Sequence, residues 1–268
     1  PTDERVVASL SGLAMRHLDH ARYAEAVPIL RSVLEINERL YGPGSAAAGH
    51  SVYSLGLTLK KLGHFDEALP LLERALDIRT TTLGPQHPDV GMALGSLGSW
   101  HQRTGNNDEA LRLFERALAV HVHALGEDHP VALQAAINLG IAVEASGDLA
   151  RADDLYRETL ATLEHETMDE VVLARVQHHR GRLLVRTGRP DEAEALLSES
   201  LTTRRRILGP RHVDVAQSLH TLGWLNESTG RLDLARDQFG EALAIRLERL
   251  DPDHPDVFES RTDLERVR

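Results

Sequence analysis

A repeat of about 42 residues runs through this sequence and constrains its fold more than any other feature. A glycine recurs in steps of 42, 42, 42, 41 and 42 residues, with alanine in the first copy, at Ala21, Gly63, Gly105, Gly147, Gly188 and Gly230. A repeat of this length is typical of solenoids, in which one supersecondary unit is copied and stacked on its neighbours.

The third copy shows what one unit contains. Two amphipathic runs, 88–102 and 108–124, flank Gly105, and glycines at 84 and 126 stand where helices are expected to end. Each copy is therefore predicted to be a hairpin of two helices. The predicted hairpins cover about 5–40, 46–82, 88–124, 130–165, 171–207 and 213–249, followed by a partial seventh helix at 255–268.

Two further columns predict how the helices of one hairpin pack. A small residue recurs inside the first helix, at Ala14, Gly56, Gly98, Gly140, Gly181 and Gly223. A large apolar residue recurs inside the second, at Leu30, Leu72, Phe114, Tyr156, Leu197 and Phe239. Glycine inside a helix costs roughly 1 kcal/mol relative to alanine, so its recurrence predicts a close helix crossing. The large residue is expected to fill the space beside it.

Composition limits the function classes. The net charge of −11 argues against a nucleic-acid-binding domain, which normally presents a basic surface. The sequence has no apolar run of 18 or more residues and no signal-peptide pattern, so neither a membrane partner nor export is predicted and the cytoplasm is the default location. The absence of cysteine excludes disulfides and thiolate chemistry. No GxxxxGK[ST] phosphate-binding loop occurs.

The residues around the glycine columns carry a family resemblance. In the third copy Gly98, Gly105, Glu109, Ala110 and Ala117 follow one another, and the second copy has the same order. This order resembles the tetratricopeptide repeat, and the 42-residue length with connections such as LGPQHPDV resembles its kinesin-light-chain type. The resemblance covers essentially the whole chain. It implies an all-α, right-handed superhelical solenoid forming a single domain over 1–268.

The same resemblance implies a function. Such solenoids are scaffolds for proteins or peptides rather than enzymes, with no cofactor, and the first helix of each hairpin lines a concave surface. In bacterial relatives the array often follows a switch domain, so this chain is expected to be the interaction or sensor arm of a larger bacterial protein. The missing initiator methionine favours a fragment, although 255–268 is alternatively a polar end-cap helix. The alternative function is a structural spacer or a self-association module, in which the terminal helix packs against another copy.

Kinesin light chains hold a cargo peptide with an Asn-Asn pair in the first helix. The corresponding places read Tyr53-Ser54, Gly95-Ser96, Ile137-Asn138, His178-His179 and His220-Thr221. Only Asn138 matches, so recognition of motor cargo is not the expected function.

The fifth hairpin departs from the repeat pattern in having a polar first helix. A basic stripe follows the spacing i, i+3, i+4, i+7 and i+11 along one side of this helix, at Arg175, His178, His179, Arg182 and Arg186. By the family pattern that side faces the groove. The predicted ligand groove adds Tyr53, Lys60, Arg103, Asn138, His220 and Trp224.

Arginine beside tryptophan and tyrosine is typical of interface hot spots, and the stripe favours an acidic or carboxylate-bearing partner. If His178 or His179 contacts that partner, binding is expected to tighten as the pH falls through about 6.5. A solvated, arginine-rich helix face is the other interpretation of the stripe.

The remaining histidines favour structural roles over metal binding. His87, His129, His212 and His254 recur in the connections, where capping or packing is expected. The side chains of His121 and His123, two residues apart on a helix, diverge by roughly 200° and are not expected to share a metal ion. No catalytic constellation stands out from the 41 acidic residues.

Overall fold

A computed structural model describes residues 2–20, 22–165 and 169–267. This part of the chain consists of thirteen α-helices and contains no strand, which confirms the all-helical fold class. None of the described helices is long and apolar enough to cross a membrane. The helices form two compact units, Pro1–Ala142 and Val143–Arg268. Because each unit is compact by itself, one continuous solenoid domain over 1–268 stays a prediction.

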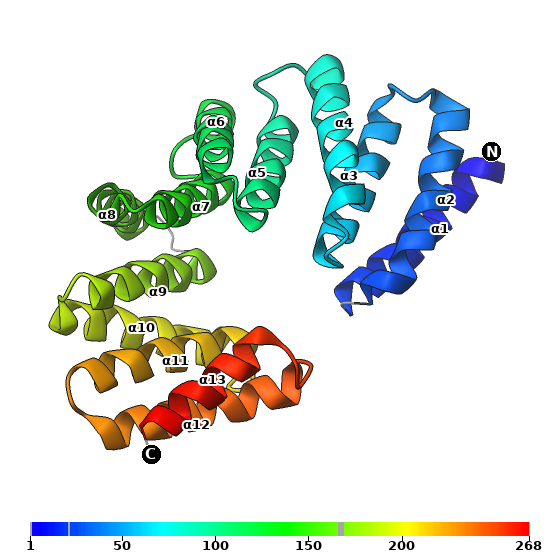
Figure 1. Ribbon diagram of the computed structural model, residues 1–268. Helices are drawn as coiled ribbons and strands as arrows, with labels where there is room; N and C mark the ends of the chain where they lie inside the picture. Colours follow the sequence, from blue (N-terminus) through cyan, green and yellow to red (C-terminus); the bar gives the residue numbers. More distant parts are fainter. Residues whose placement is uncertain (1, 21, 166–168, 268) are drawn as a thin grey trace. The chain divides into compact units, whose positions relative to one another are not determined.

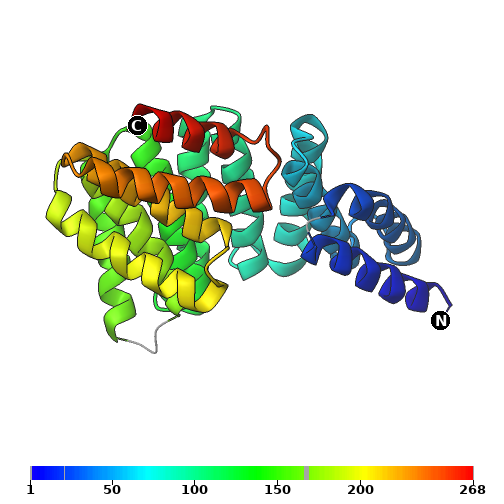
Figure 2. The ribbon, with the colours of Figure 1, turned by 90° about the horizontal axis from the view of Figure 1, so that it is seen from below.

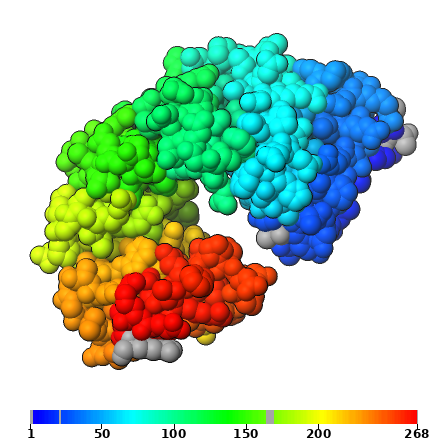
Figure 3. All heavy atoms as spheres, viewed as in Figure 1, coloured from blue at the N-terminus to red at the C-terminus, as the bar shows by residue number. Residues whose placement is uncertain are grey.

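The first unit contains three complete hairpins. They are α1 (Thr2–Asp19) with α2 (Tyr23–Tyr41), α3 (Ala46–Lys61) with α4 (Phe65–Leu83), and α5 (Pro88–Arg103) with α6 (Asn107–Leu125). Helix α7 (Pro130–Ser146) begins in this unit, and its last turn belongs to the second. Consecutive hairpins meet through α2 and α3 and through α4 and α5, so the blue, cyan and green segments follow one another in chain order (Figures 1 and 3).

The second unit continues the pattern. It contains α8 (Leu149–His165), α9 (Glu170–Arg186) with α10 (Pro190–Leu208), α11 (Val213–Ser228) with α12 (Leu232–Arg249), and α13 (Pro255–Arg266). Helix α8 packs on α9, α10 on α11, and α13 lies beside α12 at the end of the unit (Figure 2). The first helix of each predicted hairpin begins, and the second ends, within three residues of the expected position. Residue 21 of the glycine column, and residues 166–168 of the irregular connection before the fifth hairpin, lie outside the described residues.

Backbone geometry explains the residues at the helix ends. Gly84 follows α4 with φ 89° and Gly105 separates α5 from α6 with φ 84°, a left-handed conformation that glycine adopts without a side-chain penalty. At the start of the first helices, a histidine Nδ1 accepts the backbone N–H two residues ahead, at His87, His129, His212 and His254. The capping role predicted for these histidines is confirmed.

The small and large columns meet, as predicted, at Gly56 and Leu72, Gly98 and Phe114, Gly181 and Leu197, and Gly223 and Phe239. A Cβ built on Gly98 would lie 3.1 Å from Cε1 of Phe114, and one built on Gly181 would lie 2.6 Å from Cγ of Leu197. Leu197 is fully buried and Phe114 nearly so. The glycine therefore allows the second helix to approach the first closely, and the large side chain sets the distance between the two helices.

Buried arginines join consecutive hairpins. Arg204 Nη1 donates to the Asp214 carbonyl oxygen at 2.9 Å and to Ser218 Oγ at 2.9 Å. Arg79 and Arg246 donate in the same way to the carbonyl oxygen ten residues ahead. A buried guanidinium is costly unless it is hydrogen-bonded, so each arginine fixes the first turn of the following hairpin.

Two glycine substitutions should shift stability in opposite directions. Gly181→Ala places a methyl group against Leu197, and overpacking of this kind costs about 1–3 kcal/mol, more than the ~1 kcal/mol that alanine gains over glycine in a helix. Gly95→Ala should instead stabilise the protein, because a Cβ there meets nothing within 4 Å. Urea unfolding followed by circular dichroism measures both shifts. Equal shifts in the two variants would contradict the close crossing at Gly181.

Candidate functional site

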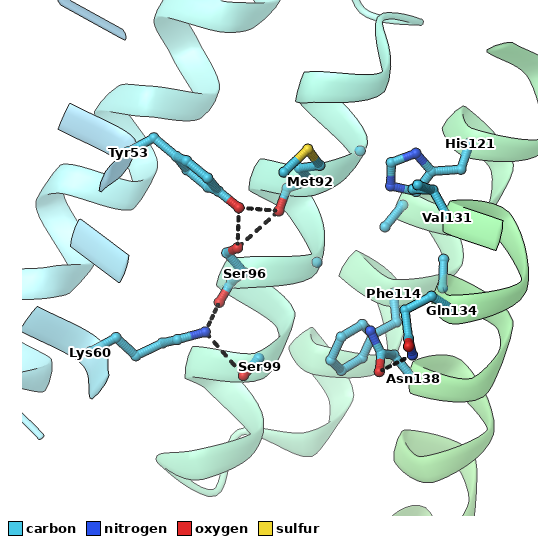
Figure 4. A pocket seen from close by; sticks show the side chains of 14 residues that line it. Tyr53, Lys60, Met92, Ser96, Ser99, Phe114, His121, Val131, Gln134 and Asn138 are labelled. Carbon is cyan, nitrogen blue, oxygen red and sulfur yellow. Dashed lines mark hydrogen bonds between the residues drawn. The ribbon is translucent and has the colours of Figure 1, made fainter. Parts of the chain in front are cut away.

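Side chains of α3, α5, α6 and α7 enclose an open pocket of about 310 Å³ in the first unit (Figure 4). The pocket lies on the face formed by the first helices of the second, third and fourth hairpins, where the family pattern places a groove. Its lining includes three of the predicted groove residues, Tyr53, Lys60 and Asn138. The structure therefore brings these three together.

Tyr53 forms a fixed wall of the pocket. Its hydroxyl lies 2.9 Å from Ser96 Oγ and 3.4 Å from the Met92 carbonyl oxygen, both on α5. The guanidinium carbon of the buried Arg79 lies over the tyrosine ring, 3.8 Å from its centroid. Such cation–π contacts stabilise a ring position by about 0.5–2 kcal/mol. Tyr53 is therefore held in place before any ligand arrives.

Lys60 supplies the charge in this pocket. Its Nζ donates to Ser99 Oγ at 3.1 Å and to the Ser96 carbonyl oxygen at 3.4 Å. Burial, followed by the positive charges of Arg103 and Lys61, lowers the pKa of Lys60 to about 8. In the part of the chain that the structure describes, no carboxylate lies within ion-pair distance of Nζ. The ammonium thus has three N–H groups and two protein acceptors.

The middle of the pocket is open because α5 carries a glycine there. Gly95 occupies the repeat position of Tyr53, and a Cβ at this position would meet nothing within 4 Å. Phe114 and Val131 add apolar surface. The side-chain amide of Asn138 accepts a hydrogen bond from Gln134 at 3.4 Å, and both amides line the pocket. One cation, two amides and an apolar surface therefore face the same space.

Arg103, another predicted groove residue, does not line this pocket. It is exposed at the end of α5, and its guanidinium carbon lies 5.5 Å from the centroid of the Phe65 ring. Its influence on the pocket is electrostatic, through the pKa of Lys60.

A contact between neighbouring first helices recurs at fixed repeat positions. Lys60 donates to Ser99 in the first unit, and the same two positions pair Glu144 with Arg182 at 2.9 Å in the second. Glu227 and Arg266 repeat this pairing, with a contact of 2.7 Å (Oε2 to Nη2). At two places in the second unit these positions thus hold an acid and an arginine, whereas at Lys60 and Ser99 in the first unit they hold a lysine and a serine.

Two arginines of the basic stripe, Arg182 and Arg186, pair with a carboxylate of the protein. Glu144 is only 3% exposed, and its two oxygens bind Arg182 at 2.9 Å and Arg186 at 2.5 Å. The stripe was expected to present these two guanidinium groups to a partner. In the structure both pair with the buried carboxylate of Glu144 in the second unit while their side chains stay 30% and 51% exposed, so presentation to a partner stays a prediction. Arg175, on the same helix, is half-buried, and burial lowers its pKa.

The two histidines of the stripe lie in the interior. His178 is fully buried and His179 is 9% exposed. Burial, and then the positive charges of Arg204 and Arg182 respectively, lowers the pKa of His178 and of His179 well below 6.5. The gain of charge that was expected near pH 6.5 therefore does not fit their surroundings. Among the described residues, no group of three or more His, Asp or Glu side chains is arranged to hold a metal ion.

Helix α13 covers the last two predicted groove residues. Asp263 Oδ2 accepts from Trp224 Nε1 at 2.7 Å and lies 2.9 Å from His220 Nε2. Burial, followed by the charge of Arg246, lowers the pKa of His220 to about 4. Trp224 was expected to be an apolar anchor for a partner, but its indole N–H is committed to the neighbouring helix.

Ser96, Ser99 and Glu144 were not among the residues predicted to line the groove. A signal for them existed in the repeat register, because Ser99 shares its position with Arg182, and Glu144 shares its position with Lys60. Repeat position, more than residue type, identifies the side chains that meet across neighbouring first helices.

Comparison with solved structures supports the fold. A putative kinesin light chain of Podospora anserina with TPR-like repeats is 25% identical, covering 75% of this chain and 95% of that chain with a TM-score of 0.63. BtubC from P. vanneervenii (23% identity, 95% of each chain, TM-score 0.63) and the apo quorum sensor NprR from B. thuringiensis (13% identity, 97% of this chain and 68% of that chain, TM-score 0.70) are similar in fold. No curated protein sequence matches this one significantly.

A model of the tetratricopeptide repeat matches four segments of the sequence, of which 5–81, 50–121 and 89–165 overlap and 172–248 stands apart. Each segment spans about two consecutive helix pairs, and together the segments cover most of the chain. The protein therefore belongs to the tetratricopeptide repeat family.

Proposed function

We propose that this protein is a peptide-binding scaffold, and that the pocket between α3, α5 and α7 receives an extended segment with an acidic side chain. The tetratricopeptide repeat fold is generally a scaffold for protein interactions. The observation that carries the proposal is Lys60, a half-buried cation that lines an open pocket and contacts no carboxylate of the described residues. In a longer bacterial protein, this groove would act as a cytoplasmic interaction or sensor arm.

The charge of Lys60 favours an acidic ligand. A carboxylate would supply an acceptor for the third N–H of the ammonium, and such charge-assisted bonds are roughly twice as strong as neutral ones. Partial burial reduces screening by solvent, so the pair should contribute more than the ~0–1 kcal/mol of an exposed salt bridge. The pocket thereby selects for charge despite the net charge of −11 on the chain.

The shape of the pocket fits a short segment of polypeptide. Its volume of about 310 Å³ is enough for one or two side chains. Gly95 leaves room for a backbone or a side chain to approach α5 closely, and the apolar ring of Phe114 lines the same pocket. Because Tyr53 is already fixed by Ser96 and Arg79, little further ordering is needed on binding.

We assign the basic stripe of α9 a structural role in the second unit. Its arginines Arg182 and Arg186 hold Glu144, and its histidines are buried. Removing both arginines would leave a buried carboxylate unpaired, which typically costs about 3–5 kcal/mol. Loss of partner binding after that double change would therefore not by itself identify a binding site.

Charge and space at the pocket should control peptide affinity. Dodecapeptides selected from a random display library on the wild-type protein should be enriched in Asp and Glu. Lys60→Met should weaken their binding by about 1.5–3 kcal/mol, the range for a hydrogen bond to a charged group. Gly95→Leu should abolish binding, because it fills the pocket without disturbing the core. Fluorescence anisotropy measures the affinities.

Lys61→Met is the matched control for charge, since Lys61 is exposed and its Nζ lies 5.1 Å from the Tyr23 ring centroid. It should bind the selected peptides like the wild type, and all three variants should keep the wild-type helical signal. Selected peptides without acidic enrichment, or equal affinities for the Lys60 and Lys61 variants, would contradict the proposal.

The buried histidines should make the protein less stable in acid. Their folded-state pKa values are lowered, so below about pH 6.5 the unfolded chain takes up protons that the folded chain does not. Each histidine then costs about 1.4 kcal/mol per pH unit. Between pH 7.5 and 5.5, the wild type should lose about 3 kcal/mol more unfolding free energy than the double variant His178→Gln, His179→Gln.

Urea unfolding at the two pH values measures this difference, with the exposed His123→Gln as control. If the wild type and the double variant lost the same free energy on acidification, these histidines would not be held neutral by the fold.

A further inference from the structure

We propose that Lys60 is a modification site, at which the side-chain amine reacts with small acyl phosphates, and that acylation closes the pocket to acidic partners. The regulatory consequence rests on the function proposed above. The reaction itself does not, because it follows from the geometry and the charges around the amine.

The neutral amine of Lys60 can keep both hydrogen bonds that the ammonium makes. A neutral amine has two N–H groups and one lone pair, whereas the ammonium has three N–H groups. Ser99 Oγ and the Ser96 carbonyl oxygen accept two N–H groups and no more. The lone pair of the neutral form is therefore not needed for any contact within the protein. Because Lys60 lines the open pocket, a small electrophile can reach it (Figure 4).

The positive charges around Lys60 also favour its neutral amine. Arg103 on α5 and Lys61 on α3 are the cations that affect it, and Tyr53 and His121 are the other titratable groups lining the pocket. With burial, the cations lower the pKa of Lys60 to about 8. Near pH 7 roughly one amine in ten is then neutral, far more than for an ordinary lysine. The same cations attract an anionic acyl donor.

The reaction is a simple acyl transfer. The Nζ lone pair attacks the carbonyl carbon of the acyl phosphate, and a carbon–nitrogen bond forms. The bond from that carbon to the phosphate oxygen breaks, and phosphate leaves with the electron pair. The proton released by the amine is taken up by the departing phosphate, which gives hydrogen phosphate. The product is a neutral amide, so the pocket loses its cation and gains the volume of the acyl group.

The sequence supplies an internal comparison for this site. Lys60 and Lys61 are the only two lysines in the chain. They are adjacent, but Lys61 is exposed and its ammonium lies over the ring of Tyr23 on α2. Lys60→Arg and Lys61→Arg therefore leave one lysine each and keep the total charge.

The two variants should differ in their rate of acylation. With acetyl phosphate at pH 7.5, the Lys61→Arg protein should be acetylated at Lys60 about tenfold faster than the Lys60→Arg protein is at Lys61. The larger neutral fraction of Lys60 is offset in part by the lower nucleophilicity of a weaker base. Peptide mass spectrometry over time gives both rates. The rate at Lys60 should level off above pH 8.

Equal rates, faster acetylation of Lys61, or a rate at Lys60 that keeps rising well above pH 8 would overturn the assignment of the site. A second measurement compares the affinity of a selected acidic peptide for the Lys61→Arg protein before and after acetylation. At least tenfold weaker binding after acetylation is expected, and unchanged binding would overturn the regulatory role. If the unmodified protein bound no acidic peptide, the proposed function would fail while the acetylation rates still tested the site.

Discussion

The contact between a glycine in the first helix and a large side chain in the second is the constraint on which the rest of the structure depends. At Gly98 and Phe114, and again at Gly181 and Leu197, it sets how closely the two helices cross. Because the sequence repeats this contact about every 42 residues, the hairpins of each unit present equivalent faces. Side chains at fixed repeat positions then meet across neighbouring first helices, which is how Lys60 comes to lie against Ser99.

The same repeat positions serve different purposes in the two units. In the second unit Glu144 and Arg182 form a pair in which the carboxylate is buried, and such a pair is strongly destabilised when one partner is removed. Between α3 and α5 of the first unit, Lys60 and Ser99 occupy these positions, so the positive charge of Lys60 has no opposite charge beside it within the described residues. The same backbone positions therefore hold a structural ion pair where the two residues have opposite charges, and a candidate binding site where, among the described residues, a single positive charge stands alone.

Much of the fold could be predicted because its determinants are local and periodic. The glycine columns, the helix caps and the large apolar column determine where the hairpins lie. The first residue of each hairpin's first helix and the last residue of its second helix agree with the prediction within three residues. Tyr53, Lys60 and Asn138 were selected from their helical positions and do line one pocket.

The basic stripe could not be interpreted in the same way. Helical spacing identifies one side of α9 but not the side chains that cover it. Glu144 lies 38 residues before Arg182 and was not connected with it. The polarity of His178 suggested exposure, although neighbouring helices bury it completely.

Hydrogen–deuterium exchange with a selected acidic peptide tests the central claim most directly, namely that ligands bind the first helices of the first unit. Protection is predicted at 53–60, 91–99 and 131–138, whereas protection confined to α4, α6 or α9 would contradict the account.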